Sequence, residues 1–334
     1  MKKQSVFITG GDGLLGSNLI RVLVERNYKV TVFQVKGSKS QTLEGLPIKK
    51  VEGDILDFES IDKAMADHEV VIHAAANTTM WPPKSKAIID VNLRGTINVV
   101  NSAIKNRAQR FIHVGTANTF KNGSLAQPGN ESSEGVRTYG LDYIESKRNA
   151  QKYVLRAVKE LGLPGLVVNP TFLIGPYDSK PGSGEMILSI YKGKIPVVPN
   201  GSKTYVAAKD AAIAIANAIE MGKVGDCYIL GNHNYTYKQA FKIISECVGA
   251  VSPKYMLPDI LIRYYGKINS FLAKIFRFNP KVTRELALIS CEDHCYSGEK
   301  ARNELQMPVT SLYEAVGESF AWLKENGYVR RNEL

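Results

Sequence analysis

A glycine-rich turn directly after the first apolar run constrains the fold of this chain more than any other feature. Val6–Ile8 reads as a buried strand, and residues 17–26 carry apolar side chains at helical spacing. Between them lie four glycines: Gly10, Gly11, Gly13 and Gly16. Backbone N–H groups approach a diphosphate closely only where no Cβ intervenes, and the following helix presents its positive end. The strand, turn and helix together predict a dinucleotide cofactor near the start of the chain.

Two glycine spacings fit this turn. Gly11, Gly13 and Gly16 match G-x-G-x-x-G, whereas Gly10, Gly13 and Gly16 match the longer T-G-x-x-G-x-x-G that begins at Thr9. An ordinary glycine-rich connection between a strand and a helix is the alternative. The position of the turn between a strand and a helix favours the phosphate site.

Alternating strand and helix patterns organise the chain up to about residue 170. Apolar, β-branched runs predict strands, and apolar side chains at helical spacing predict helices between them. The expected strands are Val6–Ile8, Lys29–Phe33, Ile48–Val51, Val70–His73, Phe111–Val114 and Gly165–Val168, with helical patterns notably at 86–106 and 141–161. This order predicts an α/β fold with a Rossmann-type doubly wound parallel sheet, which binds ligands at the carboxyl ends of its strands.

The regular alternation weakens after Asn169-Pro170, and a length of 334 residues fits two structural units. A helix of small residues at 210–220 and a strand at Val224–Leu230 resemble a return to the first sheet. We therefore expect a dinucleotide-binding domain at 1–170 plus about 203–231. The remainder, 171–202 and 232–334, is expected to form a smaller, mostly helical substrate-binding lobe.

Cysteine usage and apolar run lengths bear on the compartment. The four cysteines are few and scattered, which favours free thiols in a reducing compartment, and we expect a cytoplasmic protein. No secretory signal and no apolar stretch long enough to cross a bilayer is present in the sequence. Cys291, His294 and Cys295 supply only three candidate ligands without a partner cluster, so no metal site is expected.

The formal net charge of +11 fits an anionic ligand such as a phosphorylated cofactor. The basic residues are spread along the chain without a nucleic-acid motif, so we expect no nucleic-acid partner. Residues 258–277 form an apolar and basic helical stretch that could cover the substrate or lie on a membrane surface. We favour a lobe helix with a solvated basic face; peripheral membrane contact is the alternative.

Tyr143 and Lys147 form a Y-x-x-x-K pentapeptide in a helical stretch, and four residues apart on a helix means one face. A phenol has a pKa near ~10, and an adjacent ammonium favours the phenolate and lowers that value. The stretches 205–209 and 296–300 match the pentapeptide too. Only Tyr143 follows the fifth strand, after which Thr116 would stand at the carboxyl edge of the sheet with a hydroxyl for a substrate oxygen.

These motifs, in this order, make the chain resemble the extended short-chain dehydrogenase/reductase family, within the NAD-dependent epimerase/dehydratase superfamily. The resemblance runs over nearly the whole chain and is strongest to the dihydroflavonol-reductase-like and 3β-hydroxysteroid-dehydrogenase-like branch. The matching pieces are Thr9-Gly10-x-x-Gly13-x-x-Gly16, Gly53-Asp54-Ile55, His73-Ala74-Ala75-Ala76, Val91-Asn92-Leu93-Arg94-Gly95-Thr96, Thr116, Tyr143-x-x-x-Lys147 and Asn169-Pro170.

The resemblance implies a role for each site residue. Thr116 would orient the substrate oxygen and Tyr143 would be the general acid/base. Lys147 would lower the pKa of the tyrosine and bond the nicotinamide ribose. Asn92 would support the site from a neighbouring helix, with a purely structural amide as the alternative. The implied cofactor contacts are Thr9, Gly10, Gly13, Leu14, Leu15, Gly16, Gln34, Lys36, Asp54, Ile55, Ala74, Ala75, Ala76, Tyr143, Lys147 and Pro170.

The end of the second strand bears on the choice of cofactor. An acidic residue there would bind the ribose hydroxyls of NAD, but the segment that follows Phe33 contains none. Gln34 stands at this end, and Lys36 and Lys39 with Ser38 could hold a 2′-phosphate instead. We expect NADP, with NAD as the alternative.

The expected activity is an NADP(H)-dependent oxidoreductase that interconverts a carbonyl and an alcohol on a small organic substrate. A nucleotide-sugar epimerase or dehydratase with NAD is the first alternative. It is disfavoured because Ala117 and Asn118 follow Thr116 without an acidic pair, and Lys203 is the nearest cation for a substrate diphosphate. A non-catalytic NADP-binding regulator is the second. Family members often dimerise through helices equivalent to 86–106 and 141–161, which implies a homodimer. The expected substrate contacts are Trp81, Asn118, Phe172 and Tyr177.

Overall fold

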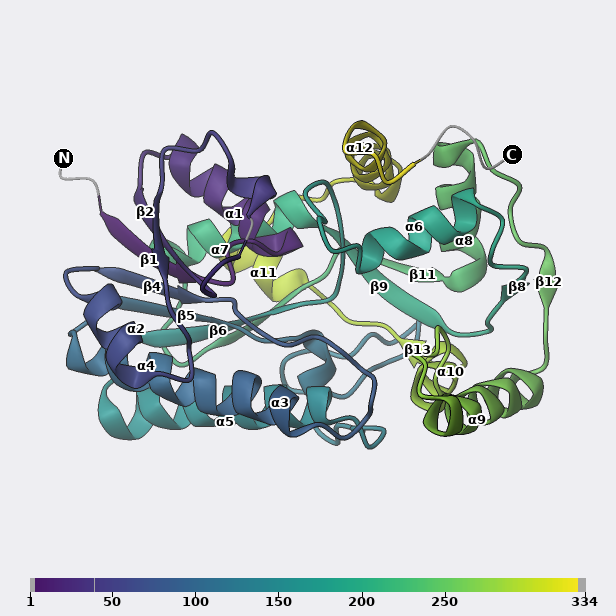
Figure 1. The fold of residues 1–334 in the computed structure, drawn as a ribbon, viewed down its shortest axis with the longest axis horizontal. Helices are drawn as coiled ribbons and strands as arrows, with labels where there is room; N and C mark the ends of the chain where they lie inside the picture. The colour runs from purple at the N-terminus through teal and green to yellow at the C-terminus, as the bar shows by residue number, and fades with distance from the viewer. Residues whose placement is uncertain (1–3, 39, 330–334) are drawn as a thin grey trace.

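The structure is a computed structural model that describes residues 4–38 and 40–329. Its first unit is a seven-stranded sheet in the order β10-β6-β5-β4-β1-β2-β3, with every neighbouring pair parallel (Figure 1). This confirms the α/β fold with a parallel sheet. The strands are β1 (Ser5–Thr9), β2 (Lys29–Gln34), β3 (Lys49–Glu52), β4 (Val70–His73), β5 (Arg110–Val114), β6 (Gly165–Pro170) and β10 (Cys227–Leu230).

Helices cover both faces of this sheet (Figure 1). One face packs against α1 (Leu14–Glu25), α7 (Ala208–Met221) and α11 (Glu299–Leu305), and the other against α2 (Phe58–Met65), α4 (Gly95–Lys105) and α5 (Asp142–Leu161). Successive side chains of a strand point to opposite faces, so Val6 and Ile8 join the first core and Phe7 joins the second. Burial on both faces explains why the inner strands are largely apolar, whereas the edge strand β3 is mostly exposed and polar.

The helix expected at 86–106 is interrupted. It is divided into α3 (Lys86–Ile89), a π-helical turn at Asp90–Arg94, and α4. Asn92 lies inside the widened turn, and its side-chain amide bonds both backbone groups of Asn77. Such single π-turns are frequent at functional sites.

The second unit contains a four-stranded sheet in addition to its helices. The strands are β7 (Phe172–Ile174), β9 (Ser202–Ala207), β11 (His233–Thr236) and β13 (Asp293–His294), and a two-residue pair joins β8 (Val197–Val198) to β12 (Tyr255–Met256). The helices are α6 (Ser183–Tyr191), α8 (Tyr237–Val248), α9 (Asp259–Phe276), α10 (Arg284–Ser290) and α12 (Leu312–Glu325), and short 3-10 turns lie at Gln41–Leu43 and Ala117–Thr119.

Two segments, β9 and α11, lie in a different unit from the one expected for their residue ranges. We expected the segment from about residue 203 to belong to the first domain. β9, which spans Ser202–Ala207, lies instead in the sheet of the second unit. The chain re-enters the first unit at α7 instead. α11, from the range assigned to the lobe, places Ala301 and Leu305 in the core beneath the first sheet.

Candidate functional site

The glycines of the first turn are required for different structural reasons. Gly10 has a φ of +74°, and a Cβ there would lie 2.5 Å from the Ala75 backbone nitrogen. A Cβ on Gly16 would overlap the carbonyl oxygen of Gly10, because the helix crosses the turn at close range. Gly13 differs, since its Cβ would meet only the Gly10 carbonyl oxygen, at 3.7 Å. The protein leaves open space on the side of Gly13 where a Cβ would project.

The start of α1 has backbone N–H donors without a hydrogen-bond partner among the described residues. Gly13 is the N-cap, no side chain caps the helix, and its first turn has no acidic residue. The N–H of Ser17 bonds the Gly13 carbonyl at 2.8 Å, so the N–H groups before it have no partner within the helix. Open space, free donors and the positive helix end fit the diphosphate of a dinucleotide, held by the turn and by Leu14 and Leu15.

The alanines after β4 lie against this turn. Ala74 donates its N–H to the Thr9 carbonyl at 3.1 Å, and Ala75 donates to Thr9 Oγ1 at 3.2 Å. Ala76 is half-buried next to them. Small side chains here allow the close approach of Gly10. The alanines and the turn therefore lie together at the carboxyl ends of β1 and β4, the edge where the cofactor was expected.

The other expected cofactor contacts follow neighbouring strands. Asp54 is exposed after β3, and its Oδ1 accepts the N–H of Leu56 at 2.9 Å. Ile55 packs over Gly95 of α4, where a Cβ would come within 2.6 Å of Ile55 Cδ1. Pro170 is buried at the end of β6. These residues border the same edge of the sheet.

Gln34 shapes the turn after β2 rather than extending into solvent. Its Oε1 accepts a hydrogen bond from Ser40 Oγ at 2.8 Å, and the side chain is buried. Lys36 is exposed, and Lys39 lies outside the described residues. Glu52, which the sequence reading missed, accepts the N–H of Gly37 at 3.3 Å. Glu52 reaches the turn after β2 because it pairs with Gln34 across β2 and β3. The sequence alone does not show which residues of two strands pair.

Thr116, Tyr143 and Lys147 are brought together beside β5. Thr116 follows the strand as the N-cap of a 3-10 turn, and its side chain contacts that of Tyr143. Lys147, one helical turn after Tyr143 in α5, is buried and donates from Nζ to the Val114 carbonyl at 2.6 Å. The start of α5 is fixed by Asp142, which accepts the N–H of Ser85 at 2.7 Å.

Burial dominates the electrostatics of this group. Burial raises the pKa of Tyr143, with the hydrogen bond to Thr116 as the opposing influence. Burial also lowers the pKa of Lys147 to about 8. We expected Lys147 to lower the pKa of the tyrosine. In the structure burial is the largest influence on that pKa, and the ammonium of Lys147 is bound to the Val114 carbonyl. A phenol is neutral at neutral pH, and the raised pKa keeps Tyr143 in this proton-donating form.

Two buried amides hold the group in place. Asn92 Nδ2 donates to the Asn77 carbonyl at 3.0 Å and to Ser146 Oγ at 3.1 Å, so it connects the loop after β4 with α5. Asn169 Oδ1 accepts the N–H of Thr116 at 3.0 Å, while its Nδ2 is buried without a partner among the described residues. The motif around Asn169 was visible in the sequence, but its contact with Thr116 was not.

The four expected substrate contacts come from separate segments of the chain. Asn118 lies next to Thr116, to whose Oγ1 its N–H donates at 3.4 Å. Phe172 is in the lobe, with the Lys203 ammonium 4.4 Å above its ring. Trp81 is half-buried between β4 and α3.

Tyr177 packs elsewhere. The guanidinium of Arg21 lies 3.5 Å from the centre of its ring, and Trp322 of α12 lies 5.9 Å away on ring centres. These contacts place Tyr177 between α1 and α12. The ring of Tyr177 therefore joins the two units.

A polar cluster that the sequence gave no sign of precedes α5. Tyr139 donates from its hydroxyl to Glu292 Oε2 at 2.6 Å and lies 3.3 Å from His294 Nε2. Arg137 pairs with the other oxygen of Glu292 at 2.7 Å. Burial and Glu292 raise the pKa of Tyr139. The partners are more than 150 positions apart, so no spacing rule could have joined them.

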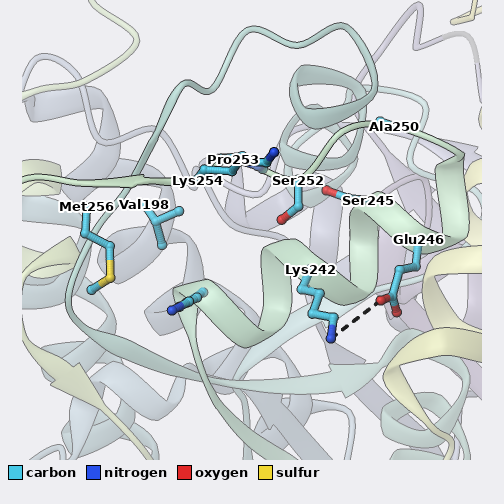
Figure 2. A pocket seen from close by; sticks show the side chains of 10 residues that line it. Val198, Lys242, Ser245, Glu246, Ala250, Ser252, Pro253, Lys254 and Met256 are labelled. Carbon is cyan, nitrogen blue, oxygen red and sulfur yellow. Dashed lines mark ion pairs between the residues drawn. The ribbon is translucent and has the colours of Figure 1, made fainter.

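A shallow hollow of about 360 Å³ lies on the lobe, away from these residues (Figure 2). Lys242 and Glu246 of α8 form an ion pair of 3.9 Å at its edge. The lining residues, drawn from α8 and the segments around β8 and β12, are Val198, Lys238, Lys242, Ser245, Glu246, Ala250, Ser252, Pro253, Lys254 and Met256. None of them belongs to the group around Tyr143.

The chain is similar to known proteins over nearly its whole length. Residues 6–231 match the model of the NAD dependent epimerase/dehydratase family. A Synechocystis protein provisionally named dihydroflavonol 4-reductase is 28% identical, with 97% of this chain and 96% of that protein covered. Sterol demethylase protein B of Methylococcus capsulatus is 26% identical, with 98% and 100% covered. The crystal structure of gox2253 superposes with a TM-score of 0.87 at 28% identity, over 98% of this chain and 100% of that one.

Proposed function

Because the chain belongs to the NAD dependent epimerase/dehydratase family, whose members use NAD(P), we propose that it is an NADP(H)-dependent oxidoreductase. It interconverts a carbonyl and an alcohol on a small organic substrate. The observation that carries this proposal is the meeting of Thr116, Tyr143 and Lys147 at the edge of the sheet that also carries the glycine turn.

Thr116, Tyr143 and Lys147 have separate roles in the reaction at the substrate oxygen. A bound nicotinamide supplies or accepts the hydride. Thr116 donates a hydrogen bond that polarises the carbonyl. Tyr143, a neutral phenol whose pKa burial raises further, gives its proton to the oxygen during reduction and takes it back during oxidation. Lys147 lies one turn away and, as a cation, favours the phenolate that proton transfer leaves behind.

Two features support a reductase over a nucleotide-sugar enzyme. Ala117 and Asn118 form the 3-10 turn after Thr116 and bring no carboxylate for a dehydration. The ammonium of Lys203 lies over the rings of Phe172 and Tyr237, so its charge is directed at aromatic faces rather than held out for a diphosphate. The name of the Synechocystis relative, a reductase, points the same way.

The decisive experiment is the variant Tyr143→Phe. Ketones, steroids, flavonoids and sugar nucleotides are first screened with NADPH at the absorbance band of the reduced nicotinamide. With the best substrate, we expect Tyr143→Phe to lower kcat by about 10²- to 10⁴-fold, because the proton donor is lost. The Kd for NADPH, measured by fluorescence, should stay within about twofold of the wild type.

Tyr153→Phe is the matched control, since this tyrosine stands on the same helix and bonds Asn101 at the surface. It should turn over normally. Near-normal turnover of Tyr143→Phe would refute the role. Interconversion of sugar nucleotides without net consumption of reduced cofactor, by protein purified with NAD bound, would instead establish the epimerase alternative.

The preference for NADP rests on the absence of an acid at the end of β2 and on the exposed Lys36. We expect kcat/KM to be higher with NADPH than with NADH. Lys36→Ala should raise KM for NADPH several-fold and leave KM for NADH unchanged, because only the 2′-phosphate would contact the ammonium. Lys50→Ala, also exposed but on β3, is the control. A clear preference for NADH contradicts this assignment.

A further inference from the structure

The outward face of α9 carries large apolar side chains that nothing among the described residues covers. Nine of them are between 38% and 74% exposed. At about 100° per residue, all nine fall within an arc of about 160°. They are Ile260, Leu261, Tyr264, Tyr265, Ile268, Phe271, Leu272, Ile275 and Phe276. We call this set the α9 apolar face.

The opposite face of α9, which attaches the helix to the protein, is made of small residues. Gly266 packs so closely on α10 that a Cβ there would lie 2.5 Å from Ala287 Cβ. Ser270 Oγ accepts the N–H of Arg284 at 2.8 Å, and Ala273 is buried. An ordinary surface helix buries its bulky face and exposes its polar one. α9 does the reverse, so the expected solvated basic face accounts for only part of its surface.

Charge beside the apolar face is almost entirely positive. Residues 259–281 contain five cations and one acid, Asp259. On the helix, Arg263, Lys267 and Lys274 lie along one flank of the apolar arc, and all three are exposed. Tyr255 and Met256 of β12, just before the helix, are exposed as well. Figure 1 places α9 at the outer end of the lobe, away from the seven-stranded sheet.

We propose that α9 lies in the surface of an anionic lipid bilayer, with its apolar face in the acyl boundary and its cations at the headgroups. Apolar and aromatic side chains opposite a polar face, flanked by lysine and arginine, are the pattern of helices that lie in a membrane interface. None of the helices in the described ranges is long and apolar enough to span a membrane, so α9 lies on the bilayer without crossing it.

Charge distinguishes this occupant from a second copy of the chain. A two-fold symmetric contact would place the same patch on both sides, so the five cations of each copy would be gathered around one interface without acids to balance them. A surface of negative headgroups neutralises them instead, and each cation near such a surface strengthens binding.

Co-sedimentation of the full chain with vesicles tests the proposal. Phosphatidylcholine vesicles with about one third phosphatidylserine should pellet the protein, and vesicles of phosphatidylcholine alone should pellet much less of it. The triple variant Ile268→Ser/Phe271→Ser/Ile275→Ser should lower the partition coefficient at least tenfold, because these side chains are exposed and enter the acyl boundary. Lys267→Gln/Lys274→Gln should weaken binding about tenfold or more, and only to the anionic vesicles.

Matched controls remove the same chemistry elsewhere on the surface. Leu161→Ser/Val224→Ser/Val309→Ser takes away three exposed apolar side chains, and Lys152→Gln/Lys159→Gln takes away two exposed lysines of α5. Both should bind vesicles like the wild type, and circular dichroism should report an unchanged fold for all variants. Failure of the wild type to pellet with anionic vesicles overturns the proposal. So does a triple serine variant that still binds, or a concentration-dependent dimer in light scattering that the triple variant abolishes.

Discussion

His73 and His113 lie side by side on β4 and β5, with their rings 5.4 Å apart and both fully buried. His73 is hydrogen-bonded through both ring nitrogens, to Thr9 Oγ1 at 2.7 Å and to Thr96 Oγ1 at 3.0 Å. His113 has no partner for either nitrogen among the described residues. A buried polar group without a partner costs about 1–3 kcal/mol, so the two histidines should respond differently to replacement.

We expect His113→Leu to raise the free energy of unfolding by about 1 kcal/mol, because it removes unpaired polar atoms. His73→Leu should lower the free energy of unfolding, since it leaves the hydroxyls of Thr9 and Thr96 without their partner. Urea titrations at pH 7.5, followed by circular dichroism, measure both changes. A destabilised His113→Leu would mean that its imidazole nitrogens are hydrogen-bonded after all.

Burial lowers the pKa of His73 to about 3 and that of His113 well below its usual value. Below about pH 6.5 the unfolded chain takes up protons that the folded chain does not, so stability falls as the pH drops. The stability of the neutral histidines is fully present above pH 6.5 and is lost toward the folded pKa of about 3. His113→Leu should therefore show a shallower loss of stability between pH 6.5 and 4 in the same titration. An unchanged acid limb would contradict the assignment.

At the scale of elements, two glycines of the turn between β1 and α1 serve different purposes. Gly10 is required for the fold, and we expect Gly13 to be required for binding of the cofactor. Gly10→Ala should destabilise the protein by more than about 1 kcal/mol, because its φ is +74° and the new Cβ meets the backbone of Ala75. Gly13→Ala should change stability by less than about 0.5 kcal/mol, since its Cβ has room. It should nevertheless weaken NADPH binding, because the Cβ occupies the space in front of the free N–H groups.

Thermal melts and NADPH titrations of both variants check this. Gly249→Ala is the control for backbone strain, because Gly249 has a φ of +68° but no atom within 4 Å of the new Cβ. It should lose less stability than Gly10→Ala and bind NADPH normally. A Gly13→Ala variant with unchanged affinity would place the diphosphate elsewhere.

At the scale of elements, the sequence predicted the strands of the first sheet better than the contacts between distant segments. Each of the seven expected strands is present in the sheet, because burial on both faces gives the inner strands a largely apolar sequence. The edge strand β3, with the sequence KKVE, is mostly exposed and is the exception. Side-chain periodicity did not indicate the π-turn around Asn92, since that turn depends on hydrogen bonds to Asn77 from another segment. Residues within one motif, such as Tyr143 and Lys147, were found from spacing alone. Glu52, Tyr139 and Glu292 were not, because only tertiary pairing gives them a role.

At the scale of the whole molecule, β13 joins the two units. On one side Asp293 pairs with Ser202 of β9 in the lobe sheet, and its Oδ1 accepts the Ser202 hydroxyl at 2.6 Å. On the other side Cys295 exchanges backbone hydrogen bonds of 3.0 and 3.2 Å with Gly123, in the loop beyond Thr116. With α11 in the core of the first sheet as well, neither unit can be removed without breaking the other. Unfolding should therefore be one cooperative transition.

The two tryptophans allow a direct test, because Trp81 lies between β4 and α3 and Trp322 lies on α12 of the lobe. We expect the single-tryptophan variants Trp322→Phe and Trp81→Phe each to melt at one temperature, with fluorescence and far-ultraviolet circular dichroism coincident within each variant. Saturating NADPH should raise the Tm reported by either tryptophan by the same amount, since a ligand of one unit stabilises everything that unfolds with it. If Trp322 reports a lower transition that NADPH does not move, the lobe unfolds independently and the hydrogen bonds of β13 do not couple the units.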